Sequence, residues 1–173
     1  PTFLSAYPAS GDMIGQSFAY THTIHEILLL CRRMYKKWEK GVKLLKIDLE
    51  MAGKNVKMRE NLQVDRALGL QFRSGYHIFR FYQLREKLFD MKGIRRLKLL
   101  GEMKKIVLSE IETDRELLDL SKSDPRLGFH AEAEIYRYFP EKISWRIRQI
   151  EKVLREDFPY AEKEIRKENA LFP

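Results

Sequence analysis

Apolar residues recur at helical spacing along most of the chain. From Phe18 to about Gly41 they lie three and four residues apart, at Ile24, Ile27, Leu28, Cys31, Met34, Tyr35 and Trp38. This spacing predicts one face of a helix. The helix continues more weakly to Gly53, where Gly and the following Lys-Asn suit a helix end. Gly41 is the position at which we expect this helix to be interrupted or bent.

A second long helix is predicted from Val56 to Asp90. Its apolar positions drift slowly around the axis and comprise Val56, Leu62, Leu68, Phe72, Tyr76, Phe79 and Tyr82. Gly69 and Gly75 lie inside it, and each glycine costs about 1 kcal/mol relative to Ala in a helix. We therefore expect them to permit a bend or a close approach of another helix.

Two more helices follow. The third is predicted from Ile94 to about Ser121, with apolar positions at Leu97, Leu100, Val107, Ile111 and Leu118 and with Asp114 at a position in phase with the core. The fourth is predicted from Pro140 to about Asp157, and its stripe is Ile143, Ile147, Ile150 and Leu154. Pro140 suits the first position of a helix, and Pro159 is taken to follow the end of this one.

No alternating strand pattern competes with these helices. The short connections near residues 53 and 93 favour antiparallel neighbours. The predicted fold class is all-α, an antiparallel bundle of three to four long helices with a structured aromatic loop before the last helix. We expect a single helical domain over residues 1–173, with an extended lead-in at 1–17, the bundle at 18–157 and a tail at 158–173.

Composition and charge narrow the class of protein. The 173 residues are 44% hydrophobic and 34% charged, which excludes a disordered chain and a membrane-embedded one. The net charge is +8 and is uneven, because residues 32–46 carry seven Lys or Arg and one Glu. A basic face can attract nucleic acid or another polyanion, but Lys and Arg also commonly coat solvated helices. Tyr35 and Trp38 lie near the apolar stripe, so nucleic acid is not favoured as a partner.

Motifs for catalysis are scarce. The chain has no phosphate-binding glycine loop, no HExxH, no CxxC and no G-x-S-x-G. His22 and His25 lie three residues apart beside Glu26 and could share a metal ion, but two ligands are too few without partners from another helix. We favour surface histidines and predict no metal and no cofactor. Cys31 lies on the apolar stripe, where a free cysteine normally packs as an inert side chain.

The segment 123–147, SDPRLGFHAEAEIYRYFPEKISWRI, breaks the helical pattern. Ser123 and Asp124 can bond local backbone, Pro125 fixes a turn and Gly128 can take a positive φ. The aromatic residues that follow either cap the bundle, which we favour, or line a carbohydrate surface. The candidate substrate-binding residues of such a surface are Arg126, His130, Glu134, Tyr136 and Tyr138. No catalytic residue is predicted, because Glu132 and Glu134 lie on one short loop with no visible cleft opposite.

Residues 117–154 resemble the C-terminal helical region of large bacterial proteins related to glycoside hydrolases. The matching positions are Asp124, Arg126, Leu127, Gly128, Phe129, Tyr136, Tyr138, Pro140 and Glu141. The resemblance implies a fragment of a larger, periplasmic or secreted protein, whose N-terminal catalytic domain would be the partner of this segment. It implies that this chain is a non-catalytic accessory domain that braces the catalytic domain and contacts glycan. The alternative is a basic helical module that binds nucleic acid or a partner helix.

Overall fold

A computed structural model describes residues 21–52, 56–130, 135–136 and 139–171. It contains helices α1 (Ile24–Ala52), α2 (Val56–Asp90), α3 (Arg96–Ser123), α4 (Pro140–Arg155) and α5 (Asp157–Leu171). A two-residue antiparallel pair, β1 (Phe129–His130) and β2 (Ile135–Tyr136), lies in the loop before α4. The predicted all-α class is therefore confirmed, and the limits of α2 are those predicted.

Helix α1 begins at a capping box. The Thr23 backbone N–H donates to the Glu26 carboxylate at 2.7 Å, and the Glu26 N–H donates back to the Thr23 hydroxyl at 3.3 Å. These bonds satisfy N–H groups that have no partner within the helix. The helix then runs through Gly41 to Ala52 without a break. The interruption expected at Gly41 is wrong, because a single glycine costs only about 1 kcal/mol in a helix that packing stabilises.

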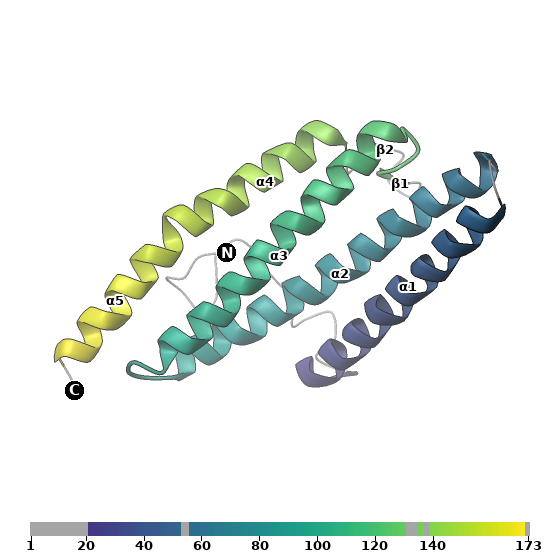
Figure 1. The fold of residues 1–173 in the computed structure, drawn as a ribbon. Helices are drawn as coiled ribbons and strands as arrows, with labels where there is room; N and C mark the ends of the chain where they lie inside the picture. Colours follow the sequence, from purple (N-terminus) through teal and green to yellow (C-terminus); the bar gives the residue numbers. More distant parts are fainter. Residues whose placement is uncertain (1–20, 53–55, 131–134, 137–138, 172–173) are drawn as a thin grey trace.

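Helices α1, α2 and α3 lie side by side in a row, and α4 and α5 follow one another end to end along α3, as Figure 1 shows. Each helix packs mainly against its neighbour in the sequence, and α5 also returns to contact α3. The core is a pair of apolar clusters along α3. One joins α2, α3 and α5 around Leu84, Met103 and Phe158, and the other joins α2, α3 and α4 around Leu70, Ile111 and Ile147.

Helices α1 and α2 approach closely at Gly69. A Cβ atom placed there would lie 2.9 Å from Cδ1 of Trp38, too close for an ordinary contact. The Trp38 indole N–H donates to the Asp65 carbonyl at 2.7 Å, and its ring packs edge-on against Phe72. The prediction that glycine permits a close helix contact is thus confirmed at Gly69. At Gly75 an added Cβ would meet open space.

The predicted tail at 158–173 is wrong where the structure describes it, because residues 157–171 form α5. Pro159 has no N–H to donate to the Arg155 carbonyl, which explains why α4 ends there. The same proline lies in the first turn of α5, where N–H groups have no partner within the helix. The helix is held to the α2–α3 connection by Asn169, whose side-chain oxygen accepts from the Ile94 N–H at 3.1 Å.

Candidate functional site

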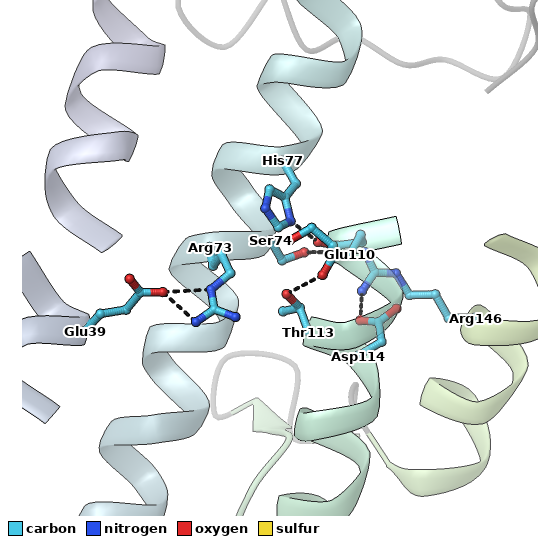
Figure 2. A network of polar contacts seen from close by, with 9 residues as sticks. Glu39, Arg73, Ser74, His77, Glu110, Thr113, Asp114 and Arg146 are labelled. Atoms are coloured by element: carbon cyan, nitrogen blue, oxygen red, sulfur yellow. Dashed lines mark hydrogen bonds and ion pairs between the residues drawn. The ribbon is translucent and has the colours of Figure 1, made fainter. Parts of the chain in front are cut away.

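Five polar side chains meet between α2, α3 and α4 (Figure 2). Ser74 and His77 come from α2, Glu110 and Asp114 from α3, and Arg146 from α4. The spacings of three and four residues place each pair on one side of its helix. His77, Glu110 and Asp114 are all buried. We call this set the polar cluster.

Glu110 is the centre of the polar cluster. Its Oε2 lies 2.7 Å from His77 Nδ1, and its Oε1 accepts hydrogen bonds from the Ser74 hydroxyl and from Nη2 of Arg146. Nη1 of Arg146 donates to Asp114 Oδ1. One guanidinium therefore bridges both carboxylates of α3 and ties α4 to α3, while Ser74 and His77 tie α2 to the same point.

The two carboxylates titrate differently. Burial acts to raise the pKa of Glu110, but the hydrogen bond from His77 and the Arg146 charge outweigh it, so the pKa is lowered and Glu110 is ionised at neutral pH. Burial raises the pKa of Asp114 to about 7. The positive charge of Arg146 acts to lower this pKa, and the negative charge of Glu110 acts to raise it. Asp114 is 1% exposed, and its Oδ2 has no hydrogen-bond partner among the described residues.

An apolar pocket of about 510 Å³ begins at the polar cluster, partly open to solvent. Its lining residues come from α2, α3 and α4 and are His77, Ile78, Phe81, Tyr82, Ile106, Val107, Glu110, Arg146, Gln149, Ile150 and Val153. A largely apolar cavity with a few convergent polar groups is the usual form of a small-molecule site. Asp114 is not among the lining residues, so of the two carboxylates of the polar cluster only that of Glu110 lines the pocket.

A separate ion pair ties α1 to α2. Nε of Arg73 donates to the Glu39 carboxylate at 2.8 Å, and Nη2 of Arg73 contacts the same oxygen at 2.5 Å (Figure 2). Both side chains are partly exposed. The pair therefore orients the two helices, and exposed pairs of this kind contribute only about 0 to 1 kcal/mol.

The predicted loop site is only partly described. Arg126 donates to the Asp124 carboxylate through Nε and Nη2, at 2.9 Å and 2.6 Å, and its Nη2 lies 3.5 Å from the Glu60 carbonyl. The hydrogen bond from Arg126 lowers the pKa of Asp124. Gly128 has a φ of 87°, as predicted. Arg126 thus fixes the turn after α3 beside the start of α2.

The other predicted loop residues stay predictions as site residues. His130 pairs through its backbone with Ile135, and Tyr136 pairs with Phe129. Glu134 and Tyr138 lie outside the described residues. The two-residue ladder therefore brings the His130 and Tyr136 segments to one hairpin.

The remaining sequence candidates lie on α1 or just before it. His22 and His25 are exposed, and within the described ranges no three metal-ligating side chains gather into a group. The hydrogen bond from the Thr23 backbone lowers the pKa of Glu26. Burial raises the pKa of the Cys31 thiol, which favours the unreactive form.

Of the polar cluster, only Asp114 is indicated by the sequence pattern, and the other four residues are not. Asp114 was conspicuous because a charged residue stands in phase with the apolar stripe of α3. Glu110 stands one turn earlier, and Ser74 and His77 have a similar spacing on α2. The signal was therefore present as polar residues at core-phase positions on two helices, but only the fold shows that Arg146 meets both.

Comparison of the chain with protein-family models, with curated proteins and with solved structures finds no match in any of the three. None of the helices in the described part of the chain is both long enough and apolar enough to cross a membrane. The fold and the polar cluster are therefore described from the structure of this chain alone. The resemblance of residues 117–154 stays a prediction.

Proposed function

We propose that the chain is a non-catalytic helical accessory module that braces another domain of the same polypeptide through α1. The observation that supports this most is the outer surface of α1. Its exposed large apolar side chains are Ile24, Leu29, Leu30, Met34, Leu44, Leu45, Ile47 and Met51, with Met51 82% exposed. Exposed apolar side chains in such a number on one helix mark an interaction surface.

The position of α1 in the row supports the same proposal. It packs mainly against α2, and the side facing α2 is formed by Leu28, Tyr35 and the half-buried Trp38. Next to this side of α1 lies a stripe of exposed apolar residues, formed by Leu30, Met34 and Leu45. Their spacings of four and eleven residues place them on one face of the helix. Helix α3 is covered on two sides, by α2 and by α4, whereas α1 is covered mainly by α2. A domain that packs on this stripe would cover α1 on a second side as well.

The charge of α1 indicates the kind of surface that would cover it. The basic residues of the segment 32–46 are all exposed and are Arg32, Arg33, Lys36, Lys37, Lys40, Lys43 and Lys46. An apolar stripe bordered by cations fits a docking surface with an acidic rim. We further propose that the whole protein processes carbohydrate and is periplasmic or secreted. This part of the proposal rests on the resemblance of residues 117–154 alone.

The test is reassembly of the native protein from two parts. The native product is first sized in its source cells with an antibody against this chain, and we expect a mass several times 20.7 kDa. The remaining part is then mixed with this chain, whose Leu30→Asp and Leu45→Asp variants should bind it at least about tenfold more weakly, which corresponds to 1.4 kcal/mol.

Leu108→Asp is the matched control, because Leu108 is equally exposed but lies on α3. It should bind like the unchanged chain. A native product of about 20.7 kDa would overturn the proposal. Equal weakening by all three substitutions would overturn the assignment to α1.

A second candidate, binding of a polyanion such as nucleic acid, is favoured by the same exposed cations. The two aromatic side chains of the basic segment do not offer a free face to bases, since Tyr35 is buried against Tyr76 and Trp38 is bonded to α2. Only the charge remains, so binding should fall steeply with salt. A titration of a labelled oligonucleotide at rising salt, with Lys37→Gln and Lys40→Gln as the variants, separates this candidate from domain docking.

A further inference from the structure

The pocket beside the polar cluster is polar at one end and apolar at the other. Three helices contribute a polar residue at the same level, namely His77, Glu110 and Arg146. The apolar lining residues follow His77 on α2 and Arg146 on α4 by one to two turns. On α3, which is antiparallel to both, they precede Glu110 by one turn. These residues are Phe81, Tyr82, Ile106, Val107, Ile150 and Val153.

The size and shape limit what could enter. A volume of about 510 Å³ falls within the range of pockets that hold small molecules, roughly 300 to 1,000 Å³. The lining on α4 extends from Arg146 to Val153, which corresponds to about 10 Å of helix. A body of one aromatic ring with a short alkyl chain would lie along this length with its polar end at Arg146.

Arg146 offers hydrogen-bond donors at the polar end. Its bonds to Glu110, Asp114 and Ser74 are made by Nη1 and Nη2. A guanidinium has five N–H donors, and among the residues that the structure describes its Nε–H has no acceptor. The side chain is 36% exposed. Gln149 lies one turn later on α4 and lines the same pocket.

We propose that this pocket binds an uncharged amphipathic small molecule, whose hydrogen-bond acceptor meets Arg146 and whose apolar body lies between Phe81 and Val153. A carboxylate ligand is disfavoured, because Arg146 already contacts two carboxylates. A cation is disfavoured, because the guanidinium of Arg146 lies at the polar end and already pairs with the Glu110 carboxylate. A carbonyl or ether oxygen adds no charge to the polar cluster.

The experiment is a titration of the folded chain, followed by the backbone amide NMR signals of the lining residues. The probes are butyrophenone, which has a carbonyl, butylbenzene, which lacks it, and phenylbutyrate, which carries a charge. We expect butyrophenone to shift the lining signals saturably and to bind about fivefold more tightly than butylbenzene, since a net hydrogen bond contributes about 1 kcal/mol. Phenylbutyrate should bind more weakly than butyrophenone.

Ile106→Trp is the variant that fills the pocket, and Leu108→Trp is its control, because Leu108 is exposed on α3 and does not line the pocket. Ile106→Trp should weaken butyrophenone binding at least tenfold, and Leu108→Trp should not. Val153→Phe replaces Ile106→Trp if that variant fails to fold.

Absence of saturable shifts with butyrophenone, or unchanged binding by the filled variant, would overturn the site. Equal affinity for all three probes would overturn the assignment of the polar end to an acceptor.

Discussion

The two sides of α2 are built differently. Toward α3 it contributes to apolar core and to the polar cluster, where Glu110 and Arg146 join three helices. Toward α1 it offers one interface, held by Trp38 and by the Arg73–Glu39 pair, and beyond that interface the surface of α1 is exposed and apolar. The difference teaches that equal helical periodicity does not mean equal burial. One helix at the edge of a row retains an apolar surface that an inner helix buries.

The largest effect is expected from removing the bridge of the polar cluster. Arg146→Met should destabilise the fold by about 3 kcal/mol, because it leaves the Glu110 charge buried without its counter-ion. Urea unfolding measures the change. Arg148→Met, an exposed arginine on the same helix, should change stability by less than about 0.5 kcal/mol. A loss below about 1 kcal/mol for Arg146→Met would mean that the inner side of α2 does not depend on this bridge.

A smaller effect is expected from pH. The pKa of Asp114 is raised to about 7 in the fold, above its value of 3.8 in the unfolded chain. Its contribution to stability is therefore greatest below pH 4 and is lost as the pH rises toward 7. Relative to Asp114→Asn, the native chain should lose about 2 kcal/mol between pH 5 and pH 8. A constant difference between the two proteins over this range, measured by unfolding at each pH, would contradict the shift.

The interface between α1 and α2 is expected to respond to one methyl group. Gly69→Ala should cost about 1 to 2 kcal/mol, because Trp38 must move from its contact and its bond to Asp65. Gly75→Ala, with open space around it, should stabilise α2 by up to about 1 kcal/mol. Hydrogen exchange should show faster opening of α1 in the first variant only. Similar stability of the two variants would mean that the Trp38 contact adapts easily.

The smallest effect on stability is expected on the outer side of α1. Met34→Gln and Leu45→Gln should change the free energy of unfolding by less than about 0.5 kcal/mol, because both side chains are exposed. Calorimetry of the isolated chain tests this. A loss above about 1 kcal/mol would show that the stripe is already covered in the isolated chain and would remove the contrast between the two sides of α2.

The helices could be predicted from sequence because each repeats its apolar residues at a fixed period. The limits of α2 and the burial of Tyr35 and Asp114 follow from that period. Helix α5, which has Pro159 in its first turn, could not be predicted in the same way, since a proline ends one helix and suits the first turn of the next. The meeting of Arg146 with Glu110 depends on helix register and on distance in space, which no local pattern contains.

The row arrangement has a consequence for how the chain reaches its fold. Because each helix packs mainly on the one before it, most contacts can form soon after the corresponding residues are available. Chains dominated by contacts near in sequence fold quickly, since little loop-closure entropy must be lost first. The Ser74–Glu110–Arg146 bridge forms only once α4 has docked. The hairpin of α1 and α2 can therefore assemble during synthesis, before the ion pairs and hydrogen bonds that join α2, α3 and α4 have formed.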